Sequence, residues 1–180
     1  MNKKVISCII TIIVLIGIIV GVVFFLSKNS KSENIKFNNN YKYYIEFKVK
    51  SDIMLLIDNN DKVSNILYLN DEAVSSIANK KIEGKDYKKA IELIIDKMKN
   101  NNEFNNGDEF TVYKYEDSFT YSEIITELNK EFVIYGVDNK LNEKTNSLGN
   151  KLNELKINST ADSKKDLENL YNYSKELLTK

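Results

Sequence analysis

The hydrophobic pattern of this chain begins with a run of 22 residues, Val5 to Leu26, that contains no charged side chain. A helix of this length spans about 33 Å, which is enough to cross a bilayer core of about 30 Å. The run is longer than the core of a secretory signal peptide, and it ends in Phe24–Lys28, which does not form the A-x-A pattern of a cleavage site. We therefore predict an uncleaved transmembrane helix at 5–26, with a cleaved signal peptide as the alternative.

The charges beside this run predict its orientation. Lys3 and Lys4 precede the run, and positive residues favour the cytoplasmic side of a membrane. We therefore expect a cytoplasmic stub at 1–4, a lipid-embedded helix at 5–26, and an extracellular domain that follows a polar linker at 27–40. This topology places the protein in the cell membrane with a single pass.

After the linker, alternation of apolar and polar residues predicts strands. From Tyr41 to Lys50 the apolar residues fall on one face, and 53–57 is a continuous apolar run that is typical of a more deeply buried strand. A polar turn cluster at Asp58–Asp61 precedes a third strand at Val63–Leu69. Connections this short predict a three-stranded antiparallel meander.

Helical spacing replaces alternation after residue 70. Asn70 is a candidate N-cap for a short helix at about 73–78, and Asp86 is a candidate N-cap for a longer one. The apolar residues of the longer helix recur at i, i+3, i+4, i+7, i+8 and i+11; they are Tyr87, Ala90, Ile91, Ile94, Ile95 and Met98. This spacing is the clearest helical signal after the apolar run.

Three more elements complete the predicted domain at 41–137. They are a strand at 109–115, a helix that starts near Thr120, and a final strand at 132–137. The resulting order is βββααβαβ. It predicts an α+β fold in which a small mixed or antiparallel sheet packs against helices on one face.

A C-terminal helical segment is predicted at 138–180. Leucine recurs at every seventh residue, and Ser163 is a candidate cap for a last helix. The recurring residues are Leu141, Leu148 and Leu155. We expect these leucines to pack on their own domain.

The composition excludes several classes of chemistry. The chain has 26 basic residues, all of them lysine, and 26 acidic ones, so its net charge gives no basic footprint for nucleic acid. There is no histidine, and the single cysteine, Cys8, lies in the apolar run, which excludes imidazole catalysis, His-ligated metal and Cys-ligated zinc. The cluster Asp58–Asp61 does not fit a calcium-loop template. We therefore predict no enzymatic activity, catalytic residue, cofactor or metal ligand.

A tyrosine cluster at the start of the first strand has two interpretations. Tyr41, Tyr43 and Tyr44 are typical of the aromatic content of a strand. Aromatic rings of this kind also bind the faces of sugars, which is the alternative. The sequence favours the first interpretation.

Two short motifs about 15 residues apart resemble parts of a known family. The first runs from Leu69 and Asn70 to Ala73, and the second is Gly84-Lys85-Asp86. With the neighbouring strands, these motifs resemble the extracytoplasmic middle domain of RsgI-type anti-sigma factors over residues 53–110. The resemblance implies an extracytoplasmic α+β domain at about 41–137, in which the motif residues are structural.

The same resemblance implies a cleavage position. RsgI-type middle domains are cut autocatalytically at an Asn-Pro pair between the first two strands. Aligning the chains on Leu69-Asn70 and on Lys62-Val63 puts that pair at Lys50 and Ser51. The chain has no proline, and Lys50 lacks the side-chain amide that attacks its own carbonyl. We therefore predict that Lys50 and Ser51 are inactive turn residues.

These observations together predict a non-catalytic protein-interaction or signal-relay module at the cell surface. Four residues before the apolar run are too few to bind a sigma factor, so we expect no direct sigma-factor contact and no nucleic-acid contact. The expected partners are the lipid bilayer, through residues 5–26, and a membrane or surface protein. The alternative is a cell-envelope structural module or a module that binds wall glycan.

Overall fold

The computed structural model describes residues 37–180, apart from 79–80, 106, 116–120 and 135–139. The predicted stub at 1–4, the predicted membrane helix at 5–26 and most of the predicted linker at 27–40 lie outside these residues. Within them, every helix is too short or too polar to cross a membrane.

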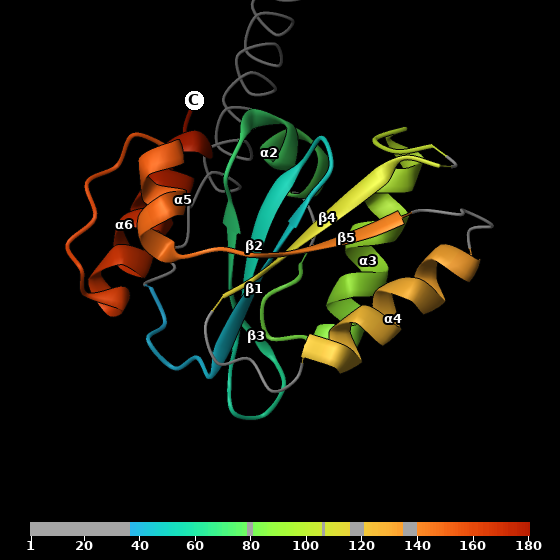
Figure 1. The fold of residues 1–180 in the computed structure, drawn as a ribbon, viewed down its shortest axis with the longest axis horizontal. Coiled ribbons are helices and arrows are strands. Elements are labelled where there is room, and N and C mark those ends of the chain that lie inside the picture. The colour runs from blue at the N-terminus through green and yellow to red at the C-terminus, as the bar shows by residue number, and fades with distance from the viewer. Residues whose placement is uncertain (1–36, 79–80, 106, 116–120, 135–139) are drawn as a thin grey trace, which may run out of the picture. The chain divides into compact units, whose positions relative to one another are not determined.

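Five strands form one mixed sheet in the order β3-β2-β1-β4-β5 (Figure 1). All neighbouring pairs are antiparallel except β4 and β5, which are parallel. The predicted three-stranded meander is therefore confirmed as β1, β2 and β3. The strands are β1 (Tyr43–Lys48), β2 (Asp52–Ile57), β3 (Val63–Tyr68), β4 (Glu109–Lys114) and β5 (Lys140–Thr145).

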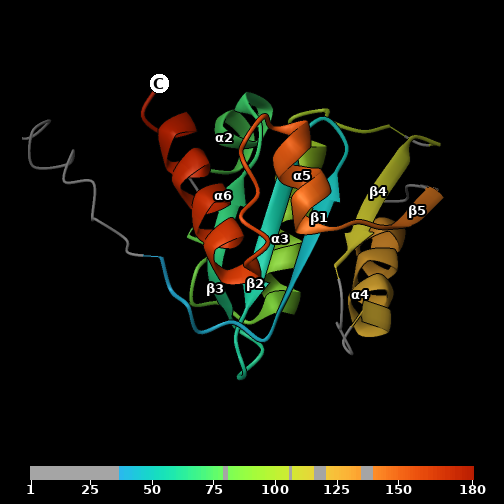
Figure 2. The same ribbon diagram turned by 60° about the vertical axis from the view of Figure 1, so that its left-hand side comes forward.

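Helices cover both faces of this sheet (Figures 1 and 2). The described elements follow the predicted order, βββααβαβ and then two helices, but the last strand lies at 140–145, within the segment predicted to be helical. The expectation that helices pack on only one face is wrong, because the C-terminal pair forms a third layer. The helices are α2 (Asp71–Ile77), α3 (Tyr87–Asn100), α4 (Tyr121–Ile134), α5 (Leu148–Glu154) and α6 (Ser163–Leu177).

Two separate cores follow from this arrangement. On one face, Ile45, Phe47 and Ile53 pack against buried residues of α2, α3 and α4. On the other face, Met54 and Leu56 pack against the buried residues of α5 and α6, among them Leu152, Leu167, Leu170 and Tyr171. Strand β2 is buried on both faces, which explains the continuous apolar run at 53–57.

The two predicted caps are confirmed. The Asn70 side chain accepts a hydrogen bond from the amide of Ala73 at the start of α2, and the Asp86 side chain accepts one from Lys88 at the start of α3. Each cap satisfies an amide that has no partner within its own helix. The cap of α6 is Asp162, one residue before the predicted Ser163.

The predicted strand at 132–137 is wrong at 132–134, which are helical, and its remainder lies outside the described residues. Phe132 lies in α4, where it packs in the same core as Ile124 and Leu128. These three residues are spaced by four, so they fall on one face of a helix. The last strand of the sheet is β5, which contains Leu141, while Leu148 begins α5 and Leu155 is the C-cap residue that follows it. The seven-residue spacing of leucine therefore does not mark one helix.

The outer edge of β3 is covered by side chains. The amide of Ile66 donates to Oε1 of Glu83 at 3.3 Å, and the amide of Tyr68 donates to the hydroxyl of Ser174 at 2.8 Å. Ser174 is a buried residue of α6. This contact ties the last helix to the edge of the sheet.

We expect Ile94→Ala to lower the free energy of unfolding by about 2–5 kcal/mol. Ile94 is 1% exposed in the core against α2, α3 and α4, which is the larger of the two, and its truncation leaves a cavity. Urea unfolding of the full chain measures this loss. Val133→Ala on α4 is the matched control, since Val133 is 78% exposed and should change stability by less than about 0.5 kcal/mol. A loss of that small size for Ile94→Ala would contradict the packing of α3.

Candidate functional site

The first unusual feature of the structure is a buried lysine on the side of α5 that faces the sheet. Ser147 caps this short helix by accepting from the amide of Asn150, and Leu152 anchors it in the smaller core. The neighbouring residue, Lys151, is 0% exposed. A lysine is almost never fully buried unless it is paired, so its partners define the site.

Lys151 binds carboxylates from three elements. Its Nζ lies 2.7 Å from Oε1 of Glu46 on β1 and 2.8 Å from Oδ2 of Asp52 on β2. It also lies 3.3 Å from Oε2 of Glu154, one turn further along α5. Glu46 is completely buried, and Asp52 is nearly so. The ammonium group therefore connects α5 to the centre of the sheet.

Two more residues complete what we call the buried ion cluster: Glu46, Lys48, Asp52, Tyr115, Lys151 and Glu154. Lys48 lies 2.7 Å from Oε1 of Glu154 and 3.4 Å from Oδ2 of Asp52, at the partly exposed side of the cluster. The Tyr115 hydroxyl donates to Oε2 of Glu46. Three carboxylates thus face two ammonium groups, which leaves one excess negative charge when all of them are ionised.

The electrostatics of the cluster follow from its burial. Burial raises the pKa of Glu46, and the nearby charge of Asp52 raises it further, to about 7, although Lys151 and Tyr115 act in the opposite direction. Burial alone would lower the pKa of Lys151, but the carboxylates of Asp52 and Glu46 outweigh it and raise that pKa. Lys151 therefore stays charged, and Glu46 is the group that titrates near neutral pH.

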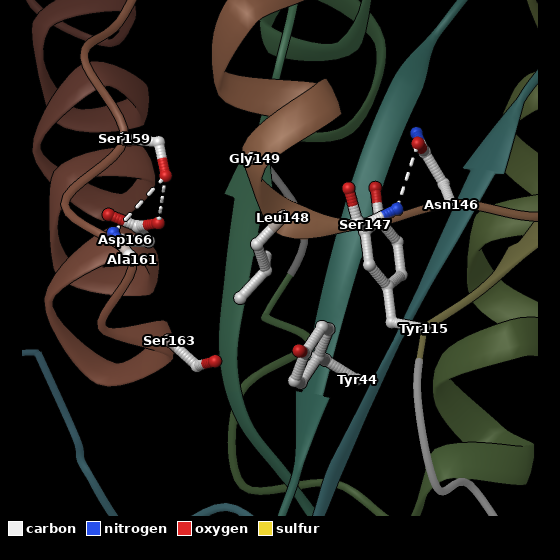
Figure 3. A pocket seen from close by; sticks show the side chains of 10 residues that line it. All are labelled: Tyr44, Tyr115, Asn146, Ser147, Leu148, Gly149, Ser159, Ala161, Ser163 and Asp166. Atoms are coloured by element: carbon white, nitrogen blue, oxygen red, sulfur yellow. Dashed lines mark hydrogen bonds between the residues drawn. The ribbon is translucent and has the colours of Figure 1, made fainter.

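A pocket of about 230 Å³ lies beside this cluster (Figure 3). Tyr44 and Tyr115 line it from the sheet, and their ring centroids are 5.1 Å apart. The start of α5 and the segment around the start of α6 line the other sides. From these segments come Asn146, Ser147, Leu148, Gly149, Ser159, Ala161, Ser163 and Asp166.

Among the described residues that line the pocket, Asp166 is the one charged residue, and its oxygens accept hydrogen bonds from neighbouring residues. It accepts from the hydroxyl of Ser159 at 2.7 Å and from the amide and hydroxyl of Thr160 at 2.7 and 2.8 Å. Burial alone would raise the pKa of Asp166, but these hydrogen bonds outweigh it and lower that pKa. The carboxylate therefore fixes the loop before α6, which forms one wall.

The chemistry of this pocket suits a neutral, hydroxylated ligand. Asn146 Oδ1 already accepts from the amide of Ser147, which leaves its NH₂ group as a donor, and the hydroxyls of Ser147 and Ser163 are further polar groups. The tyrosine rings supply an apolar surface beside them. None of the described residues that line the pocket is a lysine, so they offer no positive charge to an anion. Within the described part of the chain, no group of acidic or cysteine residues is arranged to hold a metal ion.

The predicted motif residues lie elsewhere, where they fasten loops. Asn70 accepts from the amide of Asp52 at 3.0 Å and donates to the carbonyl of Lys50 at 2.7 Å, while the amide of Leu69 donates to Asp52 O. Ala73 is buried in the larger core. The first motif therefore fastens the β1–β2 turn to the end of β3.

The second motif closes the turn before α3. Gly84 has a φ of +78°, a conformation that glycine adopts readily, and its amide donates to the carbonyl of Val63. The amide of Val63 donates in turn to the carbonyl of Lys85. Asp86 caps α3, as predicted. These contacts give the motif residues a structural role.

Lys50 and Ser51 form part of the turn between β1 and β2. The amide of Ser51 donates to Oε2 of Glu103 at 3.1 Å, and Nζ of Lys50 donates to the carbonyl of Asn102 at 3.0 Å. Ser51 is buried. The pair lies between the first two strands of the sheet, and its inactivity stays a prediction.

Sequence reasoning missed the buried ion cluster and most of the pocket. Glu46 and Lys48 fall on the polar side of the alternating pattern of β1, which predicts exposure to solvent. The unused signal was the opposite face of β2, where Met54 and Leu56 are apolar and require a second layer. Of the tyrosine cluster, Tyr44 lines the pocket and Tyr41 packs on Tyr44, with a ring separation of 6.2 Å, whereas Tyr43 belongs to the other core.

Comparison with known proteins gives no family assignment. No protein-family model matches the chain, and no curated protein matches it. The likeness to the RsgI-type middle domain therefore stays a prediction from the two motifs.

We expect Lys151→Met to lower the free energy of unfolding by about 3–5 kcal/mol, because it leaves the carboxylates of Glu46 and Asp52 buried without their ammonium partner. Adding Glu46→Gln to this variant should recover part of the loss, since one of the two charges is then removed. Urea unfolding of the full chain at pH 8 measures both. Equal stability of Lys151→Met and the unmodified chain would contradict the pairing.

The free energy of unfolding should also change with pH in a definite direction. The folded-state pKa of Glu46, about 7, lies above the ordinary value of 4.5, so its stabilising contribution is full below pH 4.5 and is lost as the pH rises through 7. The difference in stability between the unmodified chain and Glu46→Gln should change in this window.

Proposed function

We propose that this chain is a non-catalytic, membrane-anchored module that acts at the cell surface by binding a saccharide unit of wall glycan in the pocket between the sheet, α5 and α6. Binding to glycan would hold the module at the cell surface, where it contacts another protein or relays a signal. The observation that carries the proposal is the pairing of two tyrosine rings with uncharged hydroxyl and amide groups around one small pocket.

The pocket supports a saccharide over other classes of ligand. Sugars present apolar C–H faces and several hydroxyls at once, and the pocket offers rings and polar groups in the same way. Its volume of about 230 Å³ is smaller than the range of roughly 300–1,000 Å³ that is usual for small-molecule sites, so it fits one ring or the end of a chain.

The placement of the charged groups supports a binding role rather than a catalytic one. A general acid or base must reach the proton that it transfers. Glu46 and Lys151 are both completely buried and line no part of the pocket, while Asp166 already accepts three hydrogen bonds. These three side chains stabilise the fold through their ion pairs and hydrogen bonds.

Retention of the full chain, in detergent, on insoluble wall glycan tests the proposed ligand. We expect Tyr44→Ala to weaken binding about tenfold, the effect of losing roughly 1.4 kcal/mol of ring contact. Ser163→Ala, which removes an exposed hydroxyl from the rim, should weaken it less. Val133→Ala on α4 is the control, since Val133 is 78% exposed and lies outside this pocket. Failure of the unmodified chain to bind, or equal binding by all variants, would reject the proposal.

Protoplasts that carry the full chain with a C-terminal tag test its placement and integrity. Protease added outside should remove the tag if residues 41–180 are exported, and full protection would overturn the proposed topology. Without protease, we expect a single band near 20.8 kDa. A stable fragment that begins at Ser51 would show that cleavage occurs without the Asn-Pro pair.

A further inference from the structure

We propose that Glu46 is a one-proton switch that sets the hydrogen-bond direction of the Tyr115 hydroxyl beside the pocket, so that ligand binding there depends on pH. The link to a ligand rests on the proposed function, whereas the switch itself rests on the buried ion cluster alone. Both residues lie on the face of the sheet that α5 and α6 cover.

The buried ion cluster contains one more negative than positive charge when all its carboxylates are ionised. Lys48 and Glu154 pair at the partly exposed side of the cluster, where their side chains are 34% and 45% exposed. The two buried carboxylates, those of Glu46 and Asp52, both lie within 2.8 Å of the ammonium of Lys151, and Lys48 is more distant, at 3.4 Å from Asp52. A buried excess charge is costly unless it is neutralised, so uptake of one proton relieves the cluster.

The geometry then determines where the proton binds. Oε1 of Glu46 accepts from the ammonium of Lys151, which can only donate. Oε2 faces the hydroxyl of Tyr115, which can both donate and accept. A proton on Oε2 therefore makes Glu46 the donor and Tyr115 the acceptor, and the Tyr115 hydrogen must turn toward another partner.

Tyr115 connects this switch to the pocket. It follows β4 directly and lines the pocket with Tyr44 and Ser147. With Glu46 ionised, the Tyr115 hydrogen is used inside the cluster. With Glu46 protonated, it becomes available to an acceptor oxygen at the pocket, such as a sugar hydroxyl.

The remaining groups around Glu46 do not replace it as the titrating site. Every layer packed against it contributes polar or charged neighbours. These neighbours are Lys48 on β1, Asp52 on β2, Tyr113 on β4, Glu154 on α5 and Tyr173 on α6. Against the effect of burial, pairing with Glu154 raises the pKa of Lys48, and pairing with Lys48 and Lys151 lowers the pKa of Glu154. Burial raises the pKa of Tyr173. Burial and the charge of Asp52 place the pKa of Glu46 at about 7.

The consequence for binding has a definite direction. A ligand that accepts from Tyr115 prefers the protonated form of Glu46, so its binding is linked to the uptake of one proton. Affinity should be highest below pH 7 and should fall as the pH rises, approaching tenfold per pH unit well above the midpoint.

An NMR titration of the full chain in detergent micelles tests the switch without any ligand. With ¹³C labels on glutamate Cδ and tyrosine Cζ, we expect one carboxyl with a midpoint within about one unit of pH 7, absent in Glu46→Gln. The Tyr115 signal, identified by Tyr115→Phe, should follow the same midpoint. Glu168→Gln, at an exposed position on α6, is the matched control and should change neither signal. A Glu46 midpoint near its ordinary value of 4.5, or a Tyr115 signal that does not follow Glu46, would overturn the switch.

Retention on insoluble wall glycan at pH 6 and pH 8 tests the link to binding. The unmodified chain should bind about tenfold more weakly at pH 8, whereas Glu46→Gln should bind equally at both, because its NH₂ group donates to Tyr115 at either pH. Equal binding by the unmodified chain at both pH values would overturn the link. Absence of binding at both would instead reject the proposed function, and the NMR midpoint still decides the switch.

Discussion

The ammonium group of Lys151 makes the second face of the sheet a buried surface. Without it, Glu46 and Asp52 would be two carboxylates beneath a helix, and α5 could not pack there at a tolerable free energy. The apolar residues of α5 and α6 supply most of the packing area, but they reach the sheet only because the polar groups beneath them are paired. The third layer, the pocket and the titration of Glu46 all depend on this one pairing.

The two cores differ in what specifies them. The core against α3 and α4 is built from apolar side chains that alternate along β1 and recur with helical spacing along α3, so both patterns are visible in the sequence. The core against α5 and α6 combines apolar contacts with an ion cluster that joins residues far apart in the chain, such as Lys151 and Glu46, which are separated by 105 positions. No local pattern encodes such a pairing.

This difference explains which parts of the structure could be predicted. The order of the strands and helices, the caps at Asn70 and Asp86, and the burial of Ile91, Ile94 and Ile95 follow from periodicity and capping chemistry. The strand predicted at 132–137 fails because its apolar residues also fit one face of a helix, and the core contacts of Phe132 decide between the two. Among the described residues that line the pocket, Tyr44 is the one for which the sequence offers a binding role, because the other walls come from segments that meet through tertiary packing.

The covered edge of β3 has a consequence for behaviour at high local concentration. An open strand edge is a template for pairing with another chain, and such pairing is a common route to aggregation. Here the amides of Ile66 and Tyr68 are already bonded to Glu83 and Ser174, so a second copy finds no donors at these positions. Copies crowded side by side are thereby kept from extending one another's sheets along this edge, and the last helix of the chain protects the protein against forming fibres through β3.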